Sequence, residues 1–204
     1  MSLPAFYESA PRIVMRDALA ETLGAADGGL IEYGYADAVR LAGHSCPTVA
    51  GAWLMARAAV RALYPDGVGE RGAIAVTMGA PEEEGTTGVI AQVFTLVTGA
   101  AATNGFHGIG GRFARNGLLA YGSGDSGAIA SFRRVDSGAT VDVTMDFSAV
   151  RPAPQLRDLM QRALAPDATA AERKAFADVW QERVRRLLLE HADDANTIRV
   201  TRRS

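Results

Sequence analysis

Apolar residues recur along the chain at two spacings, one typical of helices and one typical of strands. The longest helical pattern covers residues 48–63, after a proline that suits the first turn of a helix. Further helices are predicted for residues 12–23 and 155–164, and for a segment that begins at the capping box of Thr169 and ends near His191. The inward positions of the longest pattern are Val49, Trp53, Ala56 and Val60.

Residues 88–97 carry a mixed signal. The segment is rich in β-branched residues, which favours a strand. Its apolar residues nevertheless fall at positions i, i+1, i+4, i+5 and i+8, which is helical periodicity. They are Val89, Ile90, Val93, Phe94 and Val97. We therefore predict a buried helix here.

Short segments with alternating or β-branched residues predict the strands of a sheet. They cover residues 30–35, 74–78, 118–121, 129–135, 140–147 and 197–201. Residues 136–138 (Asp-Ser-Gly) provide the turn of a hairpin. Together, the helices and strands indicate an α+β fold with a mixed or antiparallel sheet packed against helices. We expect a core domain over residues 1–150 and a helical extension over residues 151–204, which packs on the core or on a partner subunit.

Composition and charge argue against several classes of protein, among them nucleic-acid-binding and membrane proteins. A net charge of −2 and an isoelectric point near 5.9 argue against broad binding of nucleic acid. No apolar run approaches the roughly 20 residues needed to span a bilayer, and the N-terminus lacks the pattern of a signal peptide. A single cysteine excludes an internal disulfide and suits a reducing compartment. We therefore expect a cytoplasmic protein that binds neither nucleic acid nor membrane.

The most informative motif is Gly-His-Ser-Cys-Pro at residues 43–47. It places Cys46 two residues after His44 and directly before the longest predicted helix. At this N-cap position, the positive end of the helix dipole favours a thiolate over a thiol. A thiolate near an imidazole is typical of a metal site, or of a nucleophile with its base. A small, buried and inert cysteine is the alternative.

His44 and Cys46 supply two metal ligands, whereas zinc prefers about four. His107 is the first candidate for another ligand, because it lies in a glycine-rich loop that lets side chains approach a bound group. Asp37 could add a carboxylate, although a surface or capping aspartate is commoner. The expected cofactor is a divalent metal ion, with zinc first and nickel or iron as alternatives. In a metal-free site, Cys46 is the expected nucleophile and His44 or His107 the base.

The glycine-rich loop covers residues 99–111. Its successive backbone N–H groups could bind an anion, with Arg112 or Arg115 as the counter-charge. The loop matches neither a Walker loop nor a dinucleotide fingerprint. A conformationally demanding loop without a ligand is the alternative.

The motif at residues 43–47, followed by a helix of Ala, Leu, Met and Arg, resembles the signature of the FmdE family, also called FwdE and named after a component of formylmethanofuran dehydrogenase. That signature reads Gly-His-x-Cys-Pro-Gly. Thr98 and Gly99 resemble the start of the family's second block, Thr-Gly-Cys-Thr-x-Gly, and the resemblance covers about residues 12–122. It implies an α+β core, usually dimeric, with a metal or active site around His44 and Cys46.

The chain also departs from the family pattern. Ala100 stands where the second block has cysteine, which excludes a two-cysteine site. No cysteine follows Cys46, so the C-terminal zinc finger of some members is absent, and Thr48 stands where the family often has glycine. Formylmethanofuran chemistry needs iron–sulfur clusters that this chain could not hold. The resemblance therefore implies a divergent, stand-alone member.

These observations leave three functional hypotheses. The first is a homodimeric metal-binding protein in which His44 and Cys46 bind the metal and His107, Asp37 or water completes the site. If the metal keeps an open coordination position, it could act on a small-molecule substrate. The second is a metal-free thiol enzyme with Cys46 as nucleophile. The third is an accessory or scaffold protein, whose interface would be the C-terminal helices and the apolar face around Trp180.

Overall fold

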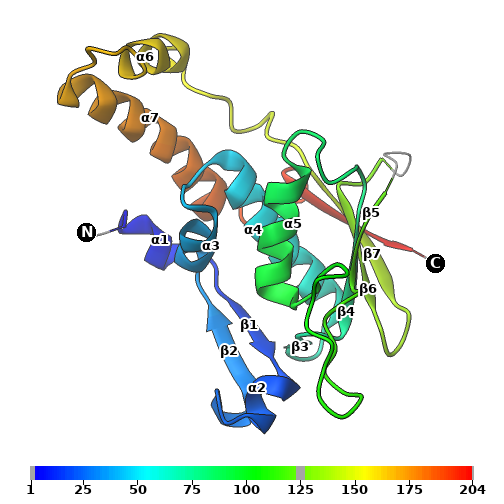
Figure 1. Cartoon of the computed structure of the whole chain (residues 1–204). Coiled ribbons are helices and arrows are strands. Elements are labelled where there is room, and N and C mark those ends of the chain that lie inside the picture. The colour runs from blue at the N-terminus through cyan, green and yellow to red at the C-terminus, as the bar shows by residue number, and fades with distance from the viewer. Residues whose placement is uncertain (1–2, 123–126, 204) are drawn as a thin grey trace.

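Helix α4 (Pro47–Leu63) lies at the centre of the fold (Figure 1). The computed structural model describes residues 3–122 and 127–203. Within α4, every residue from 49 to 56 is buried, so other elements contact this stretch on all sides. The Trp53 Nε1–H group donates a hydrogen bond of 2.9 Å to the Pro11 carbonyl oxygen. The helix predicted from the sequence is confirmed.

Helix α5 (Thr87–Thr98) packs beside α4 and buries the apolar residues that the sequence placed at helical spacing. The Phe94 ring meets the Phe132 ring edge to face, with centroids 4.8 Å apart. Gly99, at φ 72°, ends the helix in the left-handed conformation that glycine adopts readily. The predicted helix over residues 88–97 is confirmed, because tertiary burial outweighs the weak strand preference of β-branched residues.

A mixed five-stranded sheet packs against α4 and α5 (Figure 1). Its strands, in spatial order, are β5 (Leu119–Tyr121), β4 (Ile74–Met78), β6 (Ala130–Arg134), β7 (Thr140–Met145) and β8 (Ile198–Arg203). Strands β4 and β5 are parallel, and the other neighbours are antiparallel. Val76, Phe132 and Val141 lie opposite one another on the buried face, while residues between them face outward. The predicted strands of this sheet are confirmed, with small shifts at their ends.

A smaller sheet contains β2 (Leu30–Tyr33), β1 (Ile13–Arg16) and β3 (Gly69–Glu70) in that order. Three short helices lie near these strands in the sequence. Helix α1 (Phe6–Ser9) precedes β1, and α2 (Ala18–Thr22) and the 3-10 helix η1 (Asp27–Gly29) lie between β1 and β2. Strand β1 pairs antiparallel with β2 and parallel with β3. Both sheets are therefore mixed, and the predicted α+β class is confirmed.

The helix predicted for residues 12–23 is wrong. The segment divides into β1 and α2, which meet at Asp17. Ile13 and Met15 are buried and Val14 is exposed, which is the alternation of a strand. Asp17 then caps α2, because its carboxylate accepts the backbone N–H groups of Leu19 and Ala20. A capping aspartate in the middle of the segment interrupts the apparent helical pattern.

The chain after residue 150 contains α6 (Leu156–Ala163), α7 (Ala170–Leu189) and β8. In Figure 1, α6 and the first turns of α7 project away from the sheets. The predicted capping box at Thr169 and Glu172 is confirmed. Further along α7, Val184, Leu187 and Leu188 are buried in the common core, and β8 pairs with β7. Part of the expected C-terminal extension therefore packs on the core.

The described residues, 3–122 and 127–203, include no helix with the length and apolar character needed to cross a membrane.

A buried carboxylate joins the small sheet to the rest of the fold. Asp17 Oδ1 lies 2.6 Å from Arg115 Nη2, and Asp17 Oδ2 lies 3.0 Å from Arg71 Nη1. Burial raises the pKa of Asp17, but the hydrogen bond from Arg71, the charge of Arg115 and the two backbone N–H groups together lower it by more. The pKa of Asp17 therefore lies below its ordinary value, and the carboxylate stays ionised at neutral pH.

We expect Asp17→Asn to reduce the free energy of unfolding by about 3–5 kcal/mol, because Arg115 would remain buried without its ion-pair partner. Urea denaturation at neutral pH measures this loss. The stabilisation is fully present above the pKa of the unfolded aspartate, and it disappears as the pH falls through the lower pKa of folded Asp17. The difference between the two proteins should therefore shrink on acidification.

The matched control is Asp178→Asn, which removes an exposed ion pair with Lys174 on α7. An exposed pair contributes little, so this variant should unfold like the wild type. Equal losses in both variants, or a loss at Asp17 that does not depend on pH, would contradict the structural role of the buried carboxylate.

Candidate functional site

The motif at residues 43–47 connects α3 (Tyr35–Ala42) to α4. Gly43, at φ 73°, ends α3 in the left-handed conformation. Cys46 has an extended backbone and is the N-cap of α4, as predicted. Its Sγ atom accepts the backbone N–H of Val49 across 3.4 Å, and the residue is only partly buried. The sulfur is therefore placed at the positive end of a 17-residue helix dipole with access to solvent.

The exposed imidazole of His44 has a defined tautomer. Its Nδ1 atom lies 3.0 Å from the Ala42 carbonyl oxygen. Because a carbonyl oxygen can only accept, Nδ1 carries the proton, and Nε2 keeps its lone pair when the ring is neutral. Among the described residues, no hydrogen bond joins His44 to Cys46. The Nε2 atom of His44 is thus available to a metal ion, a proton or a substrate.

Ser45 anchors the motif to distant parts of the chain. Its carbonyl oxygen accepts hydrogen bonds from Trp180 Nε1 at 2.9 Å and Gln181 Nε2 at 3.3 Å, both on α7. Its buried hydroxyl lies 2.9 Å from the Tyr35 hydroxyl. Gln181 Oε1 in turn accepts the Tyr7 hydroxyl at 3.0 Å. Helix α7 therefore holds the residue that lies between the predicted site residues His44 and Cys46.

Sequence reasoning missed this anchor, because the partners of Ser45 are up to 136 positions away along the chain. The sequence instead predicts an apolar interface around Trp180, in the hypothesis of an accessory or scaffold protein. In the structure, the Trp180 indole N–H points inward to Ser45, and its ring lies against Phe176 with centroids 5.5 Å apart.

Tyr35 places a neutral hydroxyl beside the motif. Burial raises the pKa of this phenol strongly, the hydrogen bond to Ser45 lowers it in part, and nearby negative charge on Tyr7 or Cys46 would raise it further. Tyr35 therefore stays protonated throughout the neutral range.

Within the part of the chain that it describes, the structure does not bring three of the predicted metal ligands together. Asp37 Oδ2 accepts the Gly34 backbone N–H at 2.9 Å, and Asp37 Oδ1 accepts Arg40 Nη1 at 2.8 Å, so this aspartate caps α3. His107 is exposed in the glycine-rich loop. Across residues 3–122 and 127–203, no three His, Cys, Asp or Glu side chains lie close enough to hold one metal ion.

The glycine-rich loop is held by its own backbone and does not use Arg115 as a counter-charge for an anion. Ala101 N–H donates to the Arg115 carbonyl oxygen, and Arg115 N–H donates to the Phe106 carbonyl oxygen. The Arg115 guanidinium points inward to Asp17, while that of Arg112 lies 4.8 Å from the Phe113 ring centroid. The prediction of Arg115 as the counter-charge is wrong, because its guanidinium is paired with a buried carboxylate.

A first concavity, here the helix hollow, lies beside α5 and the glycine-rich loop and has a volume of about 420 Å³. Its wall includes Leu41, Thr95, Asn104, Leu119 and Tyr121. Leu41 belongs to the last turn of α3, just before the motif. The helix hollow therefore reaches the end of α3, whereas His44 and Cys46 are not among its lining residues.

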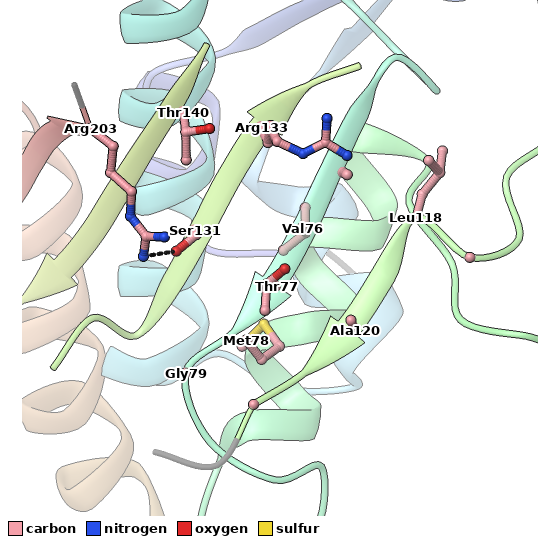
Figure 2. A pocket seen from close by; sticks show the side chains of 13 residues that line it. Val76, Thr77, Met78, Gly79, Leu118, Ala120, Ser131, Arg133, Thr140 and Arg203 are labelled. Carbon is pink, nitrogen blue, oxygen red and sulfur yellow. Dashed lines mark hydrogen bonds between the residues drawn. The ribbon is translucent and has the colours of Figure 1, made fainter. Parts of the chain in front are cut away.

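A second concavity, here the sheet hollow, lies on the outer face of the five-stranded sheet and measures about 600 Å³ (Figure 2). Ser131 and Arg133 of β6, Thr77 of β4 and Arg203 of β8 line it. The sequence analysis did not identify this region. The sequence pattern that could have indicated this region is the alternation of the polar residues Ser131 and Arg133 with the buried residues of β6.

The chain matches no family model and no curated protein. The functional argument therefore rests on the geometry of the sites.

We expect Ser45→Ala to reduce the free energy of unfolding by about 1–3 kcal/mol, because the buried Tyr35 hydroxyl would lose its partner. Tyr35→Phe removes the same hydrogen bond from the other side. The double variant should lose less than the sum of the single losses, since both single variants break the same Tyr35–Ser45 hydrogen bond. Urea denaturation of the four proteins measures this coupling, and strictly additive losses would contradict it.

Proposed function

We propose that the protein is a thiol-dependent enzyme in which Cys46 is the nucleophile. The observation that carries this proposal is the position of Cys46 Sγ, which caps α4 and accepts the Val49 N–H. A sulfur that accepts a backbone N–H at a helix N-terminus is better stabilised as a thiolate than as a thiol. The thiolate is the reactive form of cysteine.

In the proposed reaction, a sulfur lone pair of Cys46 forms a bond to an electrophilic carbon or sulfur of the substrate. The leaving group departs with the electron pair of the broken bond. The proton that the thiol releases passes to Nε2 of His44, whose Nδ1–H is held by the Ala42 carbonyl. The imidazolium then protonates the leaving group, so the protein returns no net proton to solvent.

The surroundings of Cys46 support this role. Ser45 is fixed by α7 and Tyr35, so the backbone on one side of the nucleophile is rigid. The helix hollow, which reaches Leu41 two residues before the motif, is large enough for a small-molecule substrate. A thiol that acts without oxidation also suits a reducing, cytoplasmic environment, which we propose as its location.

We expect iodoacetamide to alkylate Cys46 faster than a solvent-exposed cysteine in an unfolded peptide, at neutral pH, because the Val49 N–H and the helix dipole favour negative charge on the attacking sulfur. Intact-mass spectrometry measures the rate over a pH series, and Cys46→Ser shows that the label lies on Cys46. His44→Ala should change the pH dependence of alkylation. His107→Ala, which removes another exposed loop histidine, should not.

The proposal fails if Cys46 in the folded protein reacts more slowly than the peptide thiol at every pH. It also fails in its assignment of the base if the histidine variants give identical pH profiles.

A second candidate is the metal-binding function, and the His44 tautomer favours it. A carbonyl that accepts Nδ1–H and leaves Nε2 free is the arrangement that orients many metal-ligating histidines. His44 and Cys46 would each provide one ligand to zinc, nickel or iron. Water or a second copy of the chain would complete the site, since Asp37 is occupied as a cap.

For this candidate we expect metal bound in stoichiometric amount in untagged wild-type protein, and its loss in both Cys46→Ser and His44→Ala. Inductively coupled plasma mass spectrometry measures it, and His107→Ala is the control. Metal content near zero that does not rise on reconstitution would exclude this candidate and leave Cys46 as a metal-free thiol.

We also propose that the chain is a divergent, homodimeric relative of the FmdE family. Its support is the order of features: the motif at residues 43–47 precedes a long helix, and Thr98 and Gly99 end the next helix. Ala100 is fully buried at the position of the family's second cysteine, so Cys46 would work without a second thiol.

A further inference from the structure

The sheet hollow lies on the face of the five-stranded sheet opposite α4 and α5 (Figures 1 and 2). Several of its lining residues are small, among them Ala75, Gly79, Ala120 and Gly122. Gly79 cannot carry a larger side chain, because a Cβ atom there would lie 2.0 Å from the Ala128 carbonyl oxygen. The small residues leave a volume of about 600 Å³, which is in the range of small-molecule sites.

Arg133 brings an exposed cation to this hollow. Its side chain makes no hydrogen bond or ion pair with any of the residues that the structure describes. Figure 2 shows its guanidinium group extending from β6 toward β4, on the same face as Thr77. Its N–H donors are therefore open to a ligand, in the planar arrangement that matches a carboxylate or a phosphate.

Arg203 provides a second cation, and its position is fixed. Its Nε atom donates to Asp142 Oδ2 at 2.7 Å, and its Nη2 atom donates to Ser131 Oγ at 2.9 Å (Figure 2). The Ser131 hydroxyl donates in turn to Asp142 Oδ1 at 2.5 Å. This network holds the guanidinium of Arg203 beside the hollow without using its Nη1 atom.

The charge of the hollow is positive. Its described lining residues include two arginines and no carboxylate, and the neighbouring Asp142 is already bonded to Arg203 and Ser131. The hydroxyl of Thr77 adds a neutral donor on β4, next to the strand that carries Arg133. A positive, hydroxyl-bearing concavity in a chain of net charge −2 is suited to an oxyanion.

We propose that the sheet hollow binds a small molecule through an oxyanion group, either phosphate or carboxylate, with Arg133 as the principal contact. Arg203 and the Thr77 hydroxyl complete the anion site, and the rest of the ligand lies against Ala75 and Ala120. This binding site is separate from the motif at residues 43–47 and does not depend on the chemistry of Cys46.

The test is isothermal titration calorimetry of the full chain with pyrophosphate and, separately, with citrate. We expect at least one probe to bind the wild type, with an affinity that falls as salt is added. Arg133→Gln should weaken binding about tenfold or more, because it removes charged hydrogen bonds. Arg133→Lys keeps the charge but loses the planar fork, so its affinity should lie between the two.

The matched control is Arg151→Gln, which removes an exposed arginine outside the hollow that likewise has no partner among the described residues. It should bind like the wild type, as should Cys46→Ser. Preference for pyrophosphate identifies a phosphate ligand, and preference for citrate identifies a carboxylate. Binding that is equal in the wild type and Arg133→Gln overturns the proposal, as does the absence of binding by both probes.

Discussion

The burial of α4 on all sides over residues 49–56 is the constraint on which the structure depends. A helical segment without a polar face can exist in water only if other elements cover its whole circumference, since each large apolar side chain gains about 1.5–3 kcal/mol from burial. Helices α5 and α7 and both sheets contact α4. The fold is therefore arranged around α4, and the position of its N-terminus is determined by the same packing.

This packing has a chemical consequence at Cys46. The N-terminus of a buried helix offers N–H groups and a positive dipole that a side chain must satisfy, and here a sulfur atom does so. The preceding residue, Ser45, is held by α7 through its carbonyl oxygen and by Tyr35 through its hydroxyl. The sulfur thus lies on a rigid support with access to solvent, which is what a reactive thiol requires.

The helix hollow and the sheet hollow differ in their chemistry because different elements line them. The helix hollow lies beside α5 and the glycine-rich loop, and its walls combine leucines with neutral polar groups and one residue of each charge, Arg71 and Glu82. The sheet hollow lies on the outer face of the five-stranded sheet, where alternate residues are exposed and include Arg133 and Arg203. A charged side chain in the interior needs a partner of opposite charge. Arg115 is buried, and Asp17 neutralises its charge.

Local sequence patterns predicted the α+β class, the helices α4 and α5 and the N-cap position of Cys46, because periodicity, proline and capping act over a few residues. They failed at residues 12–23, where only the pairing of β1 with β2 and β3 distinguishes a strand from a helix. Only the packing of distant elements shows that Arg115 meets Asp17 and that Ser45 meets α7, and that among the described residues no three of the predicted metal ligands lie together. Contacts between residues 98 to 136 positions apart depend on how whole elements pack, and no local pattern records that packing.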